Sequence, residues 1–248
     1  MTLPLPTIDV PTYELELPSN GKKIKFRPFL TKEEKILLMA LESKEESDMI
    51  SAVRQIVQNC IISAYPGFDV SDLPWFDLEY FFLNLRARSM GEKVEPKFQC
   101  NSLDAAGNVC GNIITTEIDL LAVKVEKVPE HSTKILLAGN VGVKMKYPNF
   151  DSIAALRQFK EGNATEATED MIIDHIDYIY MGDTVFPVKE QSRDDLKEWL
   201  EKLTQTQFDK ISNFFTEMPK VKIKKEVKCS KCGFDHVIPF EGIASFFG

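Results

Sequence analysis

Two cysteine pairs, far apart in the sequence, constrain this chain more than any other feature. Cys229 and Cys232 lie in VKCSKCGFDHVIPF, and C-x-x-C-G spacing is typical of a turn that presents two thiolates to one metal ion. Cys100 and Cys110 lie in FQCNSLDAAGNVCGN, separated by nine residues whose Asn, Asp and Gly content is typical of a polar hairpin tip. Both pairs end in Cys-Gly, and strand-like segments flank both. We therefore expect the two turns to face each other and form a closed structural zinc site on these four cysteines.

Other uses of the cysteines stay open at this level. The first pair is spaced more widely than the two to four residues usual between paired zinc ligands, so four unligated thiols are one alternative, and iron is another. His236 follows Cys232 by four residues and could replace a distant cysteine, or lie on the surface beside the site. Cys60 shares a helical stripe with Val53 and Val57, so we expect it to be a buried core residue.

The spacing between the pairs has a consequence for folding. More than 100 residues separate Cys110 from Cys229, so the two turns would bracket a large inserted segment. Structural zinc supplies about 10 kcal/mol or more of folding free energy in small modules. We therefore expect removal of the metal to loosen the whole chain.

The predicted fold class is α+β: mostly helical, with an N-terminal β-hairpin and a discontinuous zinc-ribbon-like module whose two cysteine turns bracket an α/β insertion. YELELPSNGKKIKFRPF alternates polar and apolar residues on both sides of Ser19-Asn20-Gly21, which predicts the hairpin. The expected divisions are an N-terminal arm and hairpin over 1–30, a helical domain over 31–95, the zinc-ribbon-like module over 96–118 plus 220–248, and an inserted α+β segment ending in a helical hairpin over 119–219.

Capping signals and apolar spacing predict the helices. The expected cap pairs are Thr31 with Glu34, Ser192 with Asp195, and Thr204 with Gln207. The last two pairs begin the helical hairpin, whose aromatic stripe is expected to be core, with a partner groove as the alternative. Residues 151–162 predict a short helix and 168–182 a further one, with His175 as a core or boundary residue. TKILLAGNVGVKMKYP predicts two strands around Gly139-Asn140.

Composition and motifs exclude several classes of protein. With 44% hydrophobic and 27% charged residues the chain is globular, and a formal charge of -8 disfavours coating of a phosphate backbone. Prolines interrupt the N-terminus, and no stretch approaches the roughly 18 apolar residues of a membrane span, so we expect a cytoplasmic site of synthesis and no membrane. The three histidines lack HExxH spacing, and neither a GxSxG elbow nor a Gly-rich phosphate loop is present. We expect neither catalysis nor a small-molecule substrate.

Several blocks also resemble a known family. RPFLTKEEKILLMALES, DLEYFFLNLRARSMGE, VGVKMKYPNF, LTQTQFDKISNFFTEMPKVK and CSKCGFDHVIPFEGIASFF occur in this order from about residue 25 to the end. In them the chain resembles the baseplate hub assembly proteins of T4-like tailed bacteriophages. The resemblance implies a non-enzymatic protein that helps to build the central hub of a contractile-tail baseplate, with other hub and tail proteins as partners. It implies a place in the virion tail, in the host cytoplasm during assembly, or both, and it covers both cysteine pairs.

A zinc-ribbon nucleic-acid-binding protein, such as a phage transcription factor, is the alternative function. Its support is the run PKVKIKKEVKCSK, whose lysines would contact phosphates. The other interpretation of this run is an edge strand that lysines protect from edge-to-edge pairing, and we prefer it. These lysines are Lys220, Lys222, Lys224, Lys225, Lys228 and Lys231.

The C-terminal segment EGIASFFG carries Ile243, Phe246 and Phe247. These side chains either pack beside the zinc-ribbon-like module or present an aromatic anchor to another hub protein, because large aromatic residues dominate interface energies.

Overall fold

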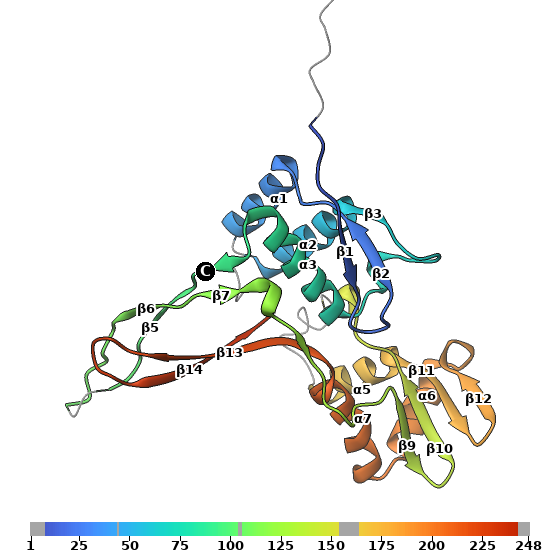
Figure 1. Ribbon diagram of the computed structural model, residues 1–248. Helices are drawn as coiled ribbons and strands as arrows, with labels where there is room; N and C mark the ends of the chain where they lie inside the picture. Colours follow the sequence, from blue (N-terminus) through green and yellow to red (C-terminus); the bar gives the residue numbers. More distant parts are fainter. Residues whose placement is uncertain (1–7, 44, 104–105, 154–163, 243–248) are drawn as a thin grey trace, which may run out of the picture. The chain divides into compact units, whose positions relative to one another are not determined.

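The computed structural model describes residues 8–43, 45–103, 106–153 and 164–242 (Figure 1). It divides into two compact units. Unit 1 consists of Met1–Val70, Phe76–Val125 and Val221–Gly248, and unit 2 of Ser71–Trp75 and Glu126–Lys220. Both units combine helices with small antiparallel sheets, so the chain is mixed α/β, and this part of the predicted fold class is confirmed. The finer domain boundaries stay a prediction.

The N-terminal hairpin is confirmed. Strands β1 (Tyr13–Glu16) and β2 (Lys23–Phe26) pair antiparallel, and β3 (Ile61–Ser63) adds to β2 to give the order β1-β2-β3. Gly21 has φ +69° and its N–H donates to the Leu17 carbonyl, which closes the turn. The turn needs glycine here because a residue with a Cβ is strained at this positive φ.

Three helices complete the first core. They are α1 (Thr31–Ser43), α2 (Glu46–Cys60) and α3 (Trp75–Met90), with a 3-10 turn at Val70–Asp72. Helix α2 ends at Cys60, and the chain enters β3 directly after it. Phe26 of the hairpin meets Phe81 of α3 with ring centroids 5.0 Å apart, and both are buried.

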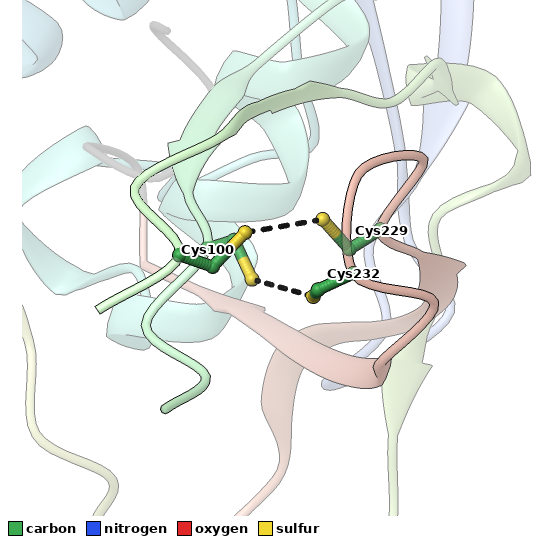
Figure 2. Close-up of side chains that lie close together, drawn as sticks. Cys100, Cys229 and Cys232 are labelled. Atoms are coloured by element: carbon green, nitrogen blue, oxygen red, sulfur yellow. Dashed lines mark hydrogen bonds between the residues drawn. The ribbon is translucent and has the colours of Figure 1, made fainter. Parts of the chain in front are cut away.

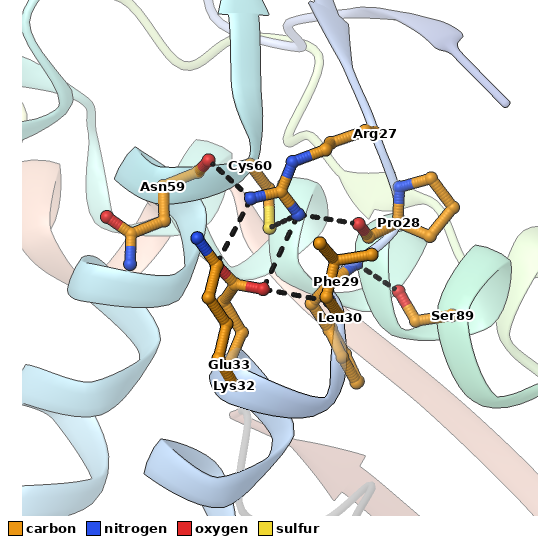
Figure 3. Close-up of polar contacts among 9 residues, drawn as sticks. All are labelled: Arg27, Pro28, Phe29, Leu30, Lys32, Glu33, Asn59, Cys60 and Ser89. Carbon is orange, nitrogen blue, oxygen red and sulfur yellow. Dashed lines mark hydrogen bonds and ion pairs between the residues drawn. The ribbon is translucent and has the colours of Figure 1, made fainter. Parts of the chain in front are cut away.

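Helix α1 begins differently from the prediction. Thr31 is already helical, so it does not cap the helix together with Glu34. Instead the Leu30 N–H donates to Glu33 Oε2 at 2.8 Å, and Arg27 Nη2 lies 3.1 Å from Glu33 Oε1 (Figure 3). Burial alone would raise the pKa of Glu33, but the hydrogen bonds from Arg27 and Leu30 lower it below its ordinary value. An apolar residue at the cap position gives no sequence signal, which is why the prediction failed.

Cys60 lies beside the ion pair of Arg27 and Glu33, at the end of α2. Its side chain is fully buried, and burial raises the pKa of the thiol to about 11. Arg27 Nη1 lies 3.7 Å from the sulfur, and Arg27 Nη2 donates to the Asn59 carbonyl at 3.1 Å (Figure 3). The predicted core role of Cys60 is confirmed.

Unit 2 is built on one antiparallel sheet of order β12-β11-β10-β9. Its strands are β9 (Lys134–Ala138), β10 (Val141–Met145), β11 (Ile176–Met181) and β12 (Thr184–Pro187). Its helices are α5 (Ala164–His175), α6 (Arg193–Glu201) and α7 (Gln205–Glu217), with a 3-10 turn at Val188–Glu190. The predicted strand pair around Gly139 is confirmed as β9 and β10.

The helix predicted over 168–182 was wrong beyond His175, where the chain becomes strand β11. Residues 176–181 are rich in Ile and Tyr, which favour a pleated strand, and Ile179 pairs directly with Val143 of β10. Long-range pairing therefore overrides the helical spacing. Most of the helix predicted over 151–162 lies outside the described residues.

The helical hairpin of α6 and α7 is confirmed together with its caps. Ser192 Oγ accepts from the Asp195 N–H, and Thr204 with Gln207 forms a complete capping box. The hairpin packs on one core with the sheet and α5, and the aromatic stripe is therefore core, as expected. The buried residues of this core are Leu137, Val143, Met145, Ile172, Ile173, Ile176, Ile179, Leu196, Leu200, Ile211 and Phe214.

The remaining strands belong chiefly to unit 1. They are β4 (Lys93–Val94), β5 (Lys97–Gln99), β6 (Ile113–Thr115), β7 (Ile118–Asp119), β8 (Val125–Glu126), β13 (Lys220–Lys228) and β14 (Asp235–Glu241), with a 3-10 turn at Leu120–Ala122. β4 pairs with β7, β5 with β6, and β14-β13-β8 form a three-stranded sheet. No helix in the described part of the chain is long and apolar enough to span a bilayer.

Candidate metal centre

Two hairpins bring the four cysteines together in unit 1 (Figure 2). Cys100 follows β5 and Cys110 shortly precedes β6, while Cys229 and Cys232 lie in the turn between β13 and β14. The inner sides of the hairpins form a small cluster in which the buried residues Cys100, Ile114 and Cys229 are packed with Phe98, Cys110 and Val227. Strand pairing thus places two pairs of thiols, distant in sequence, opposite each other.

The two turns close with the same backbone hydrogen bond. The Gly233 N–H donates to the Cys229 carbonyl at 2.9 Å, and the Gly111 N–H donates to the Cys100 carbonyl at 3.0 Å. Both glycines have positive φ, +74° and +67°, which explains the Cys-Gly pattern of both sequences. The two turns are therefore equivalent despite their different lengths.

The described residues between Cys100 and Cys110 form a tip of their own. The Cys110 N–H donates to the Ser102 carbonyl at 2.8 Å, and Leu103 and Val109 form an antiparallel bridge. The chain leaves the turn after Cys100 and returns to it at Cys110. The wide spacing therefore adds a tip, and Cys110 still takes the same place before the closing glycine as Cys232 does in the other turn.

The four sulfurs have the spacing of a tetrahedral metal site. All lie within 4.8 Å of one another, with 3.7 Å between the sulfurs of Cys100 and Cys232 and 3.9 Å between those of Cys110 and Cys229. A tetrahedron with Zn–S bonds of about 2.3 Å places neighbouring sulfurs about 3.8 Å apart. A disulfide would need about 2.0 Å. The donor set and its dimensions fit a tetrathiolate metal.

Polar side chains surround the sulfurs. Ser102 Oγ lies 3.1 Å from the Cys100 sulfur and 3.0 Å from that of Cys232, and His236 Nε2 lies 3.1 Å from the Cys100 sulfur. Asn112 Nδ2 donates to the Cys229 sulfur at 3.5 Å. His236 thus lies beside the group of four and contacts the sulfur of Cys100. Ser102 and Asn112 could not be predicted from the sequence, since nothing distinguishes them from other polar turn residues.

Hydrogen bonds favour thiolate in the second turn. The backbone N–H groups of Cys232 and Lys231 lower the pKa of Cys229 to about 6, against the effect of burial. Ser102 and the Phe234 N–H lower the pKa of Cys232. At Cys110 the Asn112 N–H lowers the pKa, but burial and the neighbouring thiols outweigh it and raise the pKa to about 11. A cation placed among the four sulfurs would relieve this crowding of charge.

The lysine run lies on β13, and its prediction as an edge strand was wrong. β13 is the middle strand of its sheet, between β14 and the two-residue strand β8. Cross-strand carboxylates compensate part of its charge, because Lys222 pairs with Glu241 and Lys228 lies 3.9 Å from Asp235. Lys231 Nζ donates to the Cys110 carbonyl at 3.0 Å and so joins the two turns. No observation here supports the nucleic-acid-binding alternative.

Two other predicted positions have different outcomes. His175 is buried in unit 2, away from any group of metal ligands among the described residues, with Nδ1 2.6 Å from the Met171 carbonyl oxygen. Its core role is confirmed. The predicted anchor residues Ile243, Phe246 and Phe247 lie outside the described residues.

Comparison with known proteins gives one family. The family model described as T4 bacteriophage base plate protein matches residues 10–248, which is nearly the whole chain. No curated protein and no solved structure gives a significant match.

Proposed function

The chain belongs to the T4 bacteriophage base plate protein family, and we propose that it is a non-enzymatic structural or assembly protein of the baseplate hub. It would act in the virion tail, or in the host cytoplasm during assembly, through contacts with other hub and tail proteins. The observation that carries the proposal is the family match over residues 10–248. The hub itself is the more specific part, and it rests on the sequence blocks quoted above.

We further propose that Cys100, Cys110, Cys229 and Cys232 bind one structural zinc ion as a zinc-ribbon-like module. Three observations support this: sulfur pairs at 3.7 and 3.9 Å, two Cys-Gly turns closed by the same hydrogen bond, and four thiols without a disulfide. Four cysteine ligands complete a tetrahedral shell and leave no position for a substrate. The ion would supply rigidity to a protein-binding surface.

Zinc would act by holding two hairpins whose own packing is small. Lys231, Ser102 and Asn112 already connect the two turns by hydrogen bonds. The metal would add four bonds at the centre of these contacts. Its role is therefore to fix the relative position of β5–β6 and β13–β14.

Two experiments test the two parts separately. Mass spectrometry of purified virions, together with a pull-down from infected cells, tests the baseplate role. We expect the chain in the particle, or bound to hub proteins in the cell. Absence from the particle together with no tail protein in the pull-down would contradict it.

Elemental analysis of protein purified without chelators tests the metal. We expect about one zinc per chain, lost in Cys232→Ser and kept in Cys60→Ser, because only Cys232 belongs to the four-sulfur group. Iron at the same stoichiometry would correct the choice of metal, whereas no metal in the wild-type protein would remove the site.

A further inference from the structure

Helix α1 has an apolar face that no described part of the chain covers. Leu37 and Ala40 are buried, but Leu38 and Met39, on the other side of the helix, are 51% and 70% exposed. Residues 36–41 read ILLMAL, so the middle of the helix is apolar on all sides. A helix of this kind normally buries both faces. The outer face of α1 is therefore suited to an interface.

Charged residues lie at both ends of this face. Lys35 precedes Met39 by four residues and Glu42 follows Leu38 by four, so all four side chains share one side of the helix. At 1.5 Å per residue, Lys35 and Glu42 are about 10 Å apart along the axis and do not reach each other. Neither makes an ion pair with any described residue. The residue one turn away from Lys35 is Met39, and the residue one turn away from Glu42 is Leu38. Neither charge therefore has an opposite charge one turn away that would stabilise the isolated helix.

The order of these four residues is self-complementary. A two-fold axis between Leu38 and Met39, perpendicular to the helix, places Lys35 of one copy against Glu42 of another, and Glu42 against Lys35. A parallel arrangement would instead place like charges together. The charge pattern therefore favours an antiparallel copy of the same helix as the partner of this face.

We propose that α1 forms a two-fold symmetric interface with α1 of a second copy of this chain. Leu38 and Met39 form its centre, and the two Lys35–Glu42 pairs set the antiparallel register. A pair of short helices covers less than the roughly 1,200 Å² typical of stable complexes, so the dimer forms reversibly and its population rises with concentration. The interface rests on α1 alone and depends neither on the metal nor on the baseplate role.

Charge-reversal variants test the interface by sedimentation velocity over a range of concentrations. Lys35→Glu places two carboxylates together at each end of the interface, and Glu42→Lys places two ammonium groups there. Each variant alone is expected to be monomeric. Mixed in equal amounts, they are expected to form a dimer, because every facing pair then has opposite charges. The double variant K35E/E42K is expected to dimerise with itself.

Control variants separate the interface from general effects of charge and folding. Lys124→Glu and Glu201→Lys change exposed charges elsewhere and are expected to leave the dimer intact. Leu38→Gln is expected to abolish the dimer without lowering the melting temperature, because Leu38 is half exposed in the monomer. A wild-type chain that stays monomeric overturns the proposal. So does a dimer that survives both single reversals, or a mixture of the two that fails to associate.

Discussion

The cysteine module and unit 2 are stabilised by different means. In the cysteine module, defined here as residues 97–115 and 225–238, the cluster between the hairpins has three buried residues, two of which are cysteines. The core of unit 2 has eleven, and all of them are apolar. Small modules with little apolar burial depend on metals or disulfides, whereas a larger core is sufficient by itself. The comparison indicates why the proposed metal would matter in the cysteine module, where the apolar core is small, and not in unit 2.

Metal removal should have the largest effect, and it should act on the cysteine module and not on unit 2. We expect chelation, or Cys229→Ser, to increase amide hydrogen exchange throughout the cysteine module, because structural zinc contributes on the order of 10 kcal/mol in small modules. Strands β9, β10 and β11 should keep their protection, since their core contains no cysteine. The sequence predicted that metal removal loosens the whole chain. We now expect this effect in the cysteine module alone.

Hydrogen exchange measured by mass spectrometry resolves the two regions, with Cys60→Ser as the matched cysteine control. That variant should retain the metal and change stability only through packing, because Cys60 is buried beside Arg27. If amide hydrogen exchange in the cysteine module stays unchanged after complete loss of metal, the metal does not stabilise this module.

Removal of a core side chain in unit 2 should have the opposite effect: it should destabilise unit 2 and leave the cysteine module unchanged. Phe214 is buried in unit 2 and packs against Tyr147 and Phe215, with ring centroids 5.3 and 5.2 Å away. Phe214→Ala should cost about 3–5 kcal/mol, because it leaves a cavity in a packed core. Chemical denaturation measures the loss. The control is Phe186→Ala, since Phe186 is 38% exposed, and its effect should be much smaller.

Metal content gives the second readout for Phe214→Ala. Zinc should remain at about one per chain, because the four sulfurs lie in the other unit. Loss of metal together with loss of the unit 2 core would show that the two regions do not act separately.

Acid should weaken unit 2 through His175, which is buried, and His131, which is partly buried. Burial lowers the pKa of His175 and of His131; Met171 and Asp174 oppose the shift at His175, Lys146 adds to it, and Glu217 opposes it at His131. Nε2 of both rings is buried without a hydrogen-bond partner, so a proton there has no acceptor.

The lowered pKa values of these histidines make unit 2 less stable as the pH falls. The unfolded chain binds protons near the ordinary histidine pKa of about 6.5, and the folded unit binds them only at lower pH. The stability is complete above about pH 6.5 and falls as the pH decreases, by at most about 1.4 kcal/mol per pH unit for His175. Denaturation at a series of pH values tests this. His175→Gln should reduce the slope, and stability that rises on acidification would contradict the prediction.

The sequence predicted local features well and long-range pairing less well. The hairpins at Gly21 and Gly139 and the caps at Ser192 and Thr204 follow from short motifs, and the structure has all of them. The facing of the two cysteine turns also followed, because matching Cys-Gly endings require matching backbone geometry.

The predictions were wrong where contacts between residues distant in the sequence determine the secondary structure. Strand β11 was predicted as helix because its apolar spacing fits both, and only pairing with β10 selects the strand. The place of β13 in the middle of its sheet depends on β8, which is two residues long and has no pattern of its own. Glu33 replaced the predicted cap because Arg27, six residues earlier, pairs with it.

The smallest expected effect concerns one hydroxyl group at the start of α7. Thr204 Oγ1 accepts from the Gln207 N–H, and Gln207 Oε1 accepts from the Thr204 N–H at 2.8 Å. Thr204→Ala removes the first of these bonds and leaves a helix N–H without its partner, at a cost of about 1 kcal/mol. Thr206→Ala is the matched control, because Thr206 is exposed in the first turn of the same helix and does not cap it. If unit 2 is stabilised by its own packing and caps, Thr204→Ala should lower its denaturation midpoint while hydrogen exchange in the cysteine module stays unchanged. Equal midpoints for the two threonine variants would mean that the cap contributes nothing measurable, and that the large core alone determines the stability of this unit.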